Sequence, residues 1–265
     1  MDEAGRGSLA GPLLAAGVLI DLERIGRSER RALARLDDSK QKSPEEREEL
    51  YPQVIRAAAC VSIAVRSPRA IDRNGLHVSN LAALTDCMHA VCEGAPQGAT
   101  RLTGDATRLV DGFRLPACAL EHTAVVDGDA RSAAIAAASV IAKVTRDRYM
   151  RRVASVYPAW NFEGNVGYST PEHREAILEH GICPLHRRSF ASVAYSQLGL
   201  GEDEYPASPQ VGAAGGRNDQ ARPQAAASDA AALPPLEGLA DVIDIREAIR
   251  AEADPDDVEA IARDA

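Results

Sequence analysis

The sequence has too few cysteines for a disulfide framework, and their spacing does not fit a zinc ribbon. There are five, without a C-x-x-C pair, and an odd number cannot all pair within one chain. No stretch approaches the roughly 18 apolar residues of a membrane span, and no basic segment followed by an apolar core opens the chain. We therefore expect a cytoplasmic protein whose cysteines are reduced core residues.

The chain as a whole also lacks the excess of positive charge that is common in nucleic-acid enzymes. It has 30 basic and 39 acidic residues, a net charge of −9. Residues 201–265 hold 15 acidic residues and 5 arginines, a net of −10, which leaves 25 basic and 24 acidic residues in 1–200. A near-neutral body with local arginine clusters is compatible with a polyanionic partner, since affinity depends on the few cations that meet phosphates.

Composition divides the chain into three parts. Residues 1–198 are long enough to bury one large core. Residues 199–235 are dominated by Ala, Gly, Pro, Gln and Ser, which predicts a disordered linker because few large apolar side chains are available to offset the ordering entropy. Residues 236–265 form an acidic tail, whose apolar residues recur often enough for one amphipathic helix. A solvated tail without a helix is the alternative.

Strands and helices are predicted to alternate along residues 1–198, which indicates an α/β protein. Strand-like composition is found at 13–20, 60–65, 107–112 and 122–126. Ser43-Pro44-Glu45-Glu46 is a capping box with proline at the first helical position, so a helix should begin there. Apolar spacing and capping residues predict further helices at 76–93, 132–157 and 170–181.

The first residues of the chain combine two carboxylates with a glycine-rich turn. Asp2 and Glu3 stand beside Gly5-Arg6-Gly7. Glycines on both sides of an arginine let backbone N–H groups approach a phosphate, and the guanidinium supplies a forked cation. A carboxylate pair beside such a cradle suggests metal-assisted phosphodiester chemistry. Taken alone, the pair more often belongs to a solvated acidic terminus.

Two further carboxylates follow predicted strands. Asp111 comes just before Gly112 at the end of one strand, and Asp129 follows the next strand in the string Asp127-Gly128-Asp129. An α/β protein places side chains that act at the edge of its sheet at such positions. An ordinary aspartate of a strand-to-turn junction is the alternative for each.

Eight short strings, taken in order, resemble the signature of the ribonuclease HII family over residues 1 to about 196. They are Asp2-Glu3-Ala4-Gly5-Arg6-Gly7, Asp38-Ser39-Lys40, Val110-Asp111-Gly112, Gly128-Asp129, Ile135-Ala136-Ala137-Ala138-Ser139, Ala142-Lys143-Val144-Thr145-Arg146-Asp147, Gly167-Tyr168 and His186-Arg187-Arg188-Ser189-Phe190. The resemblance implies a ribonuclease-H-like fold, a mixed sheet flanked by helices with a helical C-terminal part. Residues 1–198 would be the catalytic domain.

The resemblance places the catalytic, metal-binding carboxylates on Asp2, Glu3, Asp111 and Asp129. Four clustered carboxylates repel one another without cations, and oxygen ligands favour Mg²⁺ or Mn²⁺ over zinc. Two ions roughly 4 Å apart can activate the attacking water and stabilise the departing 3′-oxygen. Adjacent residues of a regular strand point to opposite faces. We therefore expect a bend or bulge at Asp2-Glu3, or a Glu3 that reaches its ion from the strand edge or through its carbonyl.

By the same resemblance, Gly5, Arg6, Gly7 and the Tyr168 hydroxyl would read the ribose 2′-hydroxyl, which separates RNA from DNA. The candidates for phosphate contacts are Lys40, Lys143, Arg146, Arg187 and Arg188. A surface cation or a helix-packing residue is the alternative for each of them. Asp127 and Val166 occupy positions where the family usually has lysine, a departure that would weaken substrate binding more than the chemistry.

The resemblance thus predicts an endoribonuclease that hydrolyses RNA in RNA–DNA hybrids and cuts on the 5′ side of ribonucleotides embedded in duplex DNA. It would leave 3′-hydroxyl and 5′-phosphate ends. Its partner would be the hybrid or the ribonucleotide-containing duplex, and we expect a monomer. Two alternatives stay open: a type III ribonuclease H, with the same core but poor action at single ribonucleotides, and a duplex-binding protein of this fold with an impaired site.

The start of the chain carries a further expectation. Family members usually have several apolar residues before the Asp-Glu pair, whereas Met1 alone precedes it here. A strand that begins one residue before its carboxylate should fray, because terminal residues without ladder partners are poorly ordered. We expect the natural protein to extend upstream by a short apolar segment. A shortened strand that metal binding stabilises is the alternative.

Overall fold

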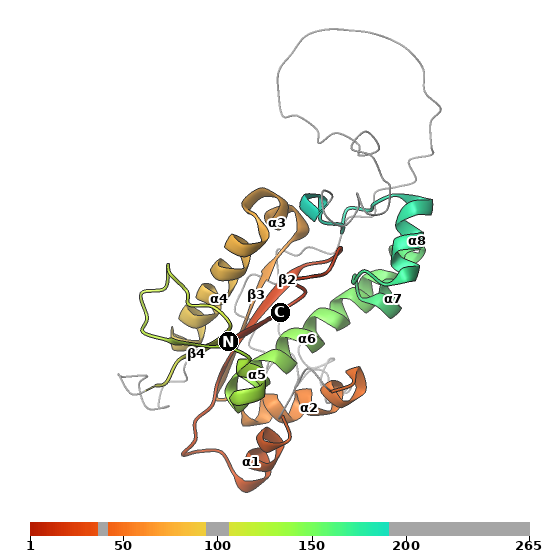
Figure 1. Cartoon of the computed structure of the whole chain (residues 1–265). Helices are drawn as coiled ribbons and strands as arrows, with labels where there is room; N and C mark the ends of the chain where they lie inside the picture. The colour runs from red at the N-terminus through yellow and green to blue at the C-terminus, as the bar shows by residue number, and fades with distance from the viewer. Residues whose placement is uncertain (37–41, 94–105, 191–265) are drawn as a thin grey trace, which may run out of the picture.

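The computed structural model describes residues 1–36, 42–93 and 106–190, and Figure 1 shows how their helices and strands are arranged. Lys40, the predicted linker at 199–235 and the predicted tail at 236–265 lie outside the described residues. Within those residues, no helix has both the length and the apolar character to cross a membrane.

Short strands form the centre of the fold. The first three make an antiparallel sheet with β2 in the middle: β1 (Asp2–Ala4), β2 (Leu13–Leu19) and β3 (Cys60–Arg66). Two more pair in parallel: β4 (Leu109–Asp111) and β5 (Thr123–Val125). All four stretches of strand-like composition are therefore strands, and both sheets use the residues next to the predicted carboxylates.

Met1 joins the two sheets. Its α-amino group donates to the carbonyl of Leu109, and its own carbonyl accepts from the N–H of Asp111, both at 3.0 Å. The strands consequently lie in the order β3-β2-β1-β4-β5, which is the mixed sheet that was expected. Met1 is buried and paired, because β4 supplies the ladder partner whose absence led to the prediction of a fraying strand.

One face of the sheet is covered by α4 (Leu76–Glu93), which follows the short helix α3 (Pro68–Asn74). The apolar stripe of α4 is core packing: Leu84 and Met88 are buried in one cluster with Ala15 and Ala64 of the sheet. Alanines on the strands let the helix come close. Asn80 of α4 lies near the carboxylate of Glu3, as described below.

The other face carries α6 (Ala133–Ala154), the long helix that runs through the middle of Figure 1. Its alanines are buried against Leu14 and Ala16 of β2, and small side chains allow this close approach. Two further helices pack beside it: α1 (Arg27–Ala34) and α2 (Pro44–Ala57). The predicted capping box starts α2, since Ser43 Oγ accepts from the N–H of Glu46 and the Glu46 carboxylate accepts from the N–H of Ser43.

The C-terminal part is helical, as expected, and packs on the second half of α6. It comprises η1 (Pro158–Trp160), α7 (Phe162–Asn165), α8 (Pro171–His180) and η2 (Arg188–Phe190). Met150 and Val153 of α6 share an apolar cluster with Phe162, Leu185 and Ala10. Ala10 belongs to the segment after the glycine-rich turn, so this cluster ties the start of the chain to its C-terminal helices.

The structure differs from the sequence prediction in three short helices and one cap. The helices α3, α5 (Gly128–Arg131) and α7 were not predicted, because each is too short to show an apolar period. Ser132 precedes α6 as predicted, but its side chain makes no capping hydrogen bond, and the helix ends at Ala154 rather than near residue 157.

Candidate active site

Three of the four predicted carboxylates lie where β1 meets β4. Asp2 and Glu3 are on β1, and Asp111 ends β4; Asp129 follows in α5. The three residues of β1 pair with β2 in consecutive register, without a bulge. Adjacent side chains therefore point to opposite faces of the sheet. A bulge at Asp2-Glu3, one of the expected ways for both carboxylates to reach the metal site, is excluded.

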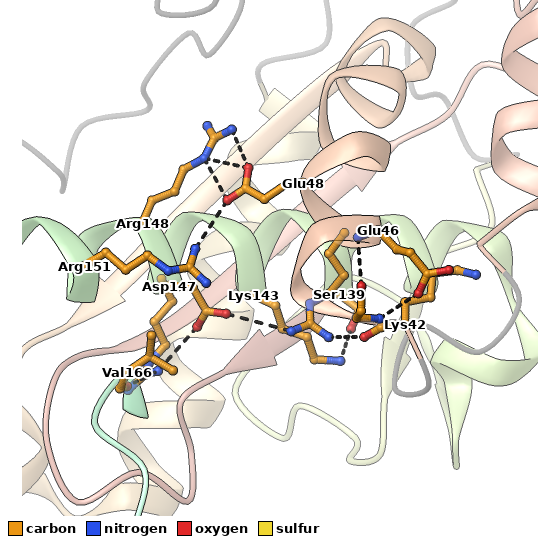
Figure 2. Close-up of polar contacts among 12 residues, drawn as sticks. Lys42, Glu46, Glu48, Ser139, Lys143, Asp147, Arg148, Arg151 and Val166 are labelled. Atoms are coloured by element: carbon orange, nitrogen blue, oxygen red, sulfur yellow. Dashed lines mark hydrogen bonds and ion pairs between the residues drawn. The ribbon is translucent and has the colours of Figure 1, made fainter. Parts of the chain in front are cut away.

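Asp2 is buried on the side of α6. Burial raises its pKa, while a hydrogen bond from Ser139 and the charge of Lys143 oppose that shift. Lys143 Nζ donates to Ser139 Oγ at 2.7 Å, a contact drawn in Figure 2. Lys143, one of the predicted phosphate contacts, thus lies beside the carboxylates and favours the ionised form of Asp2.

Glu3 lies on the opposite side, toward α4. Burial raises its pKa to about 7, with the charge of Asp2 adding to the shift; the charge of Arg6 and the nearby amide of Asn80 oppose it. Arg6 Nη1 is 3.6 Å from Glu3 Oε1. The buried Oε2 atom of Glu3 accepts no hydrogen bond of ordinary geometry from a described residue. A carboxylate with a buried, unsatisfied oxygen is suited to a cation.

Asp111 and Asp129 are linked by the backbone between β5 and α6. Asp111 Oδ1 accepts from the N–H of Gly128 at 2.7 Å, and Asp129 is buried in the next position. A Cβ on Gly128 would lie 2.5 Å from the side chain of Ile135 and 3.0 Å from Asp111 Oδ1. A glycine is required there so that α5 can bring Asp129 against the end of β4.

We tested whether these residues fit a metal ion. The described part of the chain contains no group of three His, Cys, Asp or Glu side chains already arranged as ligands. The carboxylates nevertheless sense one another, since Asp2 and Asp111 both raise the pKa of Glu3. Buried oxygen donors that repel one another fit a hard divalent cation such as Mg²⁺ or Mn²⁺. The donor set is therefore compatible with the metal that the sequence predicts.

The glycine-rich turn follows β1 directly. Gly5 has a φ of +80°, and a Cβ there would lie 2.0 Å from the Nε atom of Arg146, so a larger residue does not fit. Gly7 is exposed with open space around it. The guanidinium carbon of Arg6 lies 4.9 Å from the ring centroid of Phe113. Arg6 is thus held at the surface between Phe113 and Glu3.

Arg146 lies beneath this turn and is fully buried. Its guanidinium donates to the carbonyls of Ala10 and Pro12, each at 3.0 Å, to the carbonyl of Val166 at 2.9 Å and to Ser8 Oγ at 2.8 Å. Burial lowers its pKa, a shift that Tyr168 and Asp147 oppose. A guanidinium enclosed in this way has no path to a phosphate. The helix-packing alternative fits Arg146, and the expected phosphate contact does not.

Arg187 has the same kind of environment. It is fully buried, and it donates to the carbonyl of Gly11 at 3.0 Å and to that of Arg6 at 2.9 Å. Its position also supports the turn rather than a phosphate. Arg188 is exposed, and its backbone N–H donates to Asp72 Oδ2 at 3.0 Å, so it stays a candidate phosphate contact together with Lys143. Lys40 lies outside the described residues.

Tyr168 is brought to the turn by backbone pairing. The carbonyl of Gly167 accepts from the N–H groups of Leu9 and Ala10 at 2.9 and 3.1 Å. The Tyr168 ring stacks against the buried Arg146, 5.1 Å from guanidinium carbon to ring centroid, and the residue is 40% exposed. Tyr168 thus lies against Arg146, the residue that also lies beneath Gly5, and keeps a surface open to solvent.

Comparison with known proteins identifies the family. The model of the family described as Ribonuclease HII matches residues 1–193.

The chain belongs to the ribonuclease HII family.

Curated relatives in the ribonuclease HII family agree. The chain is 44% identical to "Ribonuclease HII" of Rhizobium johnstonii over 203 residues, which covers 77% of this chain and 81% of the relative. It is 42% identical to "Ribonuclease HII" of Geobacillus kaustophilus over 193 residues, with 73% of this chain and 67% of the relative covered. Family membership makes the chain a metal-dependent hydrolase, an endoribonuclease of RNA–DNA hybrids.

Solved structures show the same fold. The crystal structure of the ribonuclease H2 from Pyrococcus horikoshii OT3 matches with a TM-score of 0.57 and 26% identity, covering 76% of this chain and 97% of that one. The ribonuclease HII of Archaeoglobus fulgidus, solved in complex with PCNA, matches with a TM-score of 0.57 and 26% identity, covering 77% and 98%. A ribonuclease HIII solved with Mn²⁺ matches at 17% identity and a TM-score of 0.58, covering 74% and 68%. That likeness concerns the fold alone.

Three residues beside the ribonuclease HII site were not predicted to contribute to it. Ser139 lies within one of the matching strings. A single serine among the alanines of a predicted helix indicates a polar role, so the sequence contained a signal for this residue. Asn80 and Phe113 gave no such signal. They reach Glu3 and Arg6 only because α4 and the segment after β4 fold back over the end of β1.

Proposed function

We propose that this enzyme cuts duplex DNA on the 5′ side of an embedded ribonucleotide and leaves 3′-hydroxyl and 5′-phosphate ends. The observation that carries the proposal is the continuity of the site. Asp2 and Glu3 are followed within two residues by the Gly5–Gly7 turn, and Arg146 and Gly167 hold Tyr168 to that turn. Two of the proposed catalytic carboxylates and the turn for ribose recognition thus belong to one segment of the chain.

The carboxylates are the proposed catalytic residues. Asp2, Asp111 and Asp129 would hold two divalent ions, either Mg²⁺ or Mn²⁺, and Glu3, whose side chain points to the other face of β1, would reach an ion from the strand edge or through its carbonyl. When bound, such ions supply an activated water and stabilise charge on the leaving 3′-oxygen. The raised pKa of Glu3, about 7, and its burial support a role in holding cations. Lys143 beside Asp2 adds a fixed positive charge to the site.

Ribose recognition is assigned to the turn and to Tyr168. Backbone N–H groups at Gly5, Arg6 and Gly7 can donate to a ribose oxygen only where no side chain blocks the approach, and Gly7 has no neighbouring atom within 4 Å of a Cβ built on it. The Tyr168 hydroxyl can donate to or accept from the 2′-hydroxyl, the group that DNA lacks. Lys143 and Arg188 are the remaining described candidates for phosphate contacts, with Lys40 outside the described residues.

The partner that fits this chemistry is an RNA–DNA hybrid or a DNA duplex that contains ribonucleotides. The near-neutral charge of residues 1–200 is compatible with such a polyanion. The monomeric state and the cytoplasmic location stay predictions.

The test is cleavage of a DNA duplex with one embedded ribonucleotide, compared with a duplex that carries a run of ribonucleotides and with DNA alone. Each is incubated with Mg²⁺, with Mn²⁺ and with EDTA, and the ends are identified by ligation and by phosphatase treatment. We expect cuts 5′ of the lone ribonucleotide with either metal and none with EDTA. Cleavage only within the run would favour the type III alternative, and binding without any cleavage would favour an impaired duplex-binding protein.

A further inference from the structure

Two buried histidines lie behind Tyr168, and the site described above does not use them. His173 is on α8 and His186 precedes η2, and both rings are buried. Their Nε2 atoms are 3.1 Å apart. Phe162 packs edge-on against His173, with ring centroids 5.5 Å apart, and Trp160 lies 6.0 Å from His186. A polar pair enclosed by aromatic rings must satisfy its own hydrogen bonds.

The partners of the pair decide where each proton sits. His173 Nδ1 is 2.8 Å from the carbonyl of Tyr168, which can only accept, so Nδ1 carries the hydrogen. His186 Nδ1 accepts from the N–H of Cys183 at 3.0 Å, so this atom is bare and Nε2 carries the hydrogen. His186 Nε2–H then donates to the bare Nε2 of His173. The backbone N–H of Cys183, the two rings and the Tyr168 carbonyl form one continuous chain of donors and acceptors.

We propose that His173 and His186 are positioning residues that fix the backbone of Tyr168, and through it the Tyr168 side chain, for recognition of the ribose. This inference rests on the proposed function, since it needs Tyr168 to contact the substrate. Neither histidine touches the substrate or the carboxylates.

The loop around Tyr168 shows why such support is needed. Val166 has a φ of +42°, which a β-branched residue rarely adopts, and Gly167 has a φ of +86°. Tyr168 itself is 40% exposed, and its ring lies against the guanidinium of Arg146. Its carbonyl accepts from His173 Nδ1 and also from the N–H of Thr170 at 2.8 Å. These two donors orient the peptide that follows Tyr168 and so the direction of its side chain.

The electrostatics agree with a neutral pair. Burial lowers the pKa of both rings, to about 3 for His186. A second proton on either ring would set two N–H groups against each other, at the shared Nε2 contact or at the N–H of Cys183. The chain of hydrogen bonds therefore exists only while both rings are neutral and in these two tautomers.

The tautomers can be read directly by NMR. In protein labelled with ¹⁵N in its imidazole rings, ring nitrogens bonded to hydrogen are distinguished from bare ones by their shifts and their couplings to ring carbon-bound protons. We expect the Nδ1–H form for His173 and the Nε2–H form for His186 in the unmutated protein. The Nε2–H form for His173, or a charged ring on either residue at neutral pH, would overturn the proposal without any need for a variant.

The second test is a double-mutant cycle on the duplex with one ribonucleotide. His173→Leu fills the space without a donor, and His173→Asn keeps an N–H near the position of Nδ1. We expect His173→Leu to lower kcat/KM by about tenfold to a hundredfold, as a misplaced contact does, and His173→Asn to restore most of the rate. In the Tyr168→Ala background, His173→Leu should change kcat/KM by less than about twofold, because its effect passes through Tyr168.

The outcomes separate this inference from the proposed function. If Tyr168→Ala lowers the rate and His173→Leu lowers it by the same factor in both backgrounds, the histidines are merely structural and the inference is wrong. If Tyr168→Ala has no effect on a cleaving enzyme, Tyr168 is not a recognition residue, and the inference fails for that separate reason. His180→Leu, exposed on the same helix, is the matched control. Should His173→Leu not fold, His173→Asn and the tautomer measurement decide.

Discussion

Arg146 Nη2 donates to Ser8 Oγ at 2.8 Å, a contact between residues 138 positions apart in the sequence. It fastens the α6 helix to the turn that carries the proposed ribose contacts. Because the same guanidinium also holds the carbonyl of Val166 and stacks on Tyr168, one buried cation sets the relative position of both recognition segments.

Removal of this cation should unfold the turn. Arg146→Met leaves the buried carbonyls of Ala10, Pro12 and Val166 without a donor, so we expect the free energy of unfolding to fall by about 3–5 kcal/mol. Arg148→Met is the control, since Arg148 lies on the same helix but is partly exposed and pairs with Glu48 (Figure 2). It should cost no more than about 1 kcal/mol. Urea unfolding curves measure both, and equal losses would contradict the assigned role of Arg146.

Asp111→Asn should separate chemistry from folding. The amide oxygen can still accept from the N–H of Gly128, so the fold should survive, whereas the charge that cations need is lost. We expect cleavage with Mg²⁺ to fall by orders of magnitude while duplex binding and the melting temperature stay nearly unchanged. Asp86 of α4 forms an exposed ion pair with Arg66 of β3. The control variant Asp86→Asn should therefore cleave normally. Near-normal turnover by Asp111→Asn would remove this residue from the catalytic set.

Tyr168→Phe should reduce selectivity for the ribonucleotide. The ring can still stack on Arg146, so the variant removes only the hydroxyl. We expect kcat/KM at a lone ribonucleotide to fall by an amount equal to one lost hydrogen bond, about 1–3 kcal/mol. The melting temperature serves as the control for folding. Equal rates for the two proteins on this substrate would show that the hydroxyl does not read the ribose.

The buried histidines predict a pH dependence of stability. The pKa of His186 in the folded protein, about 3, lies below its ordinary value of 6.5, and that of His173 is shifted in the same direction. Below about pH 6.5 the unfolded chain therefore binds protons at these histidines and the folded chain does not. The free energy of unfolding should fall as the pH drops below this value, by up to about 1.4 kcal/mol per pH unit for each histidine.

This slope should depend on His186. His186→Gln removes one proton uptake in the unfolded chain, so its stability should change less between about pH 7 and about pH 5 than that of the unmutated protein. Cys183 and Tyr157 pack beside the pair, and burial raises the pKa of each, so they stay neutral in this window. His180→Gln, at an exposed position of α8, is the control. Urea curves with identical pH slopes for His186→Gln and the unmutated protein would contradict the prediction.

Substitution of Val166 should raise the stability of the protein rather than lower it. Its φ of +42° is strained for a β-branched residue, by about 1–3 kcal/mol, and the resemblance to the family leads us to expect a lysine at this position. Val166→Asn relieves the strain without charge, and Val166→Lys adds charge beside Tyr168. We expect both to raise the melting temperature, and only the lysine variant to tighten duplex binding at low salt, measured by fluorescence anisotropy. Equal affinities of the two variants would show that this position does not face the nucleic acid.

Local sequence signals predicted much of the fold. The capping box at Ser43, the proline after Thr170, the apolar stripe of α4 and the four strand-like stretches correspond to observed elements, because each depends on residues within a few positions of one another. For the adjacent Asp2 and Glu3, the sequence left open a bend or bulge or another route for Glu3, and the consecutive register of β1 excludes the bulge. The short helices α3, α5 and α7 escaped prediction because they contain too few residues for a period to appear.

Tertiary structure alone decided which cations are buried. Arg146, Arg187 and Arg188 look alike in the sequence, yet the first two are enclosed by carbonyl groups that come from the start of the chain, while Arg188 is exposed. The acceptors from the start of the chain that enclose these two guanidinium groups lie 134 to 181 residues away in the sequence, and no local pattern records that distance. The tautomers of His173 and His186 were decided in the same way, because a ring places its proton according to neighbours that only the fold supplies.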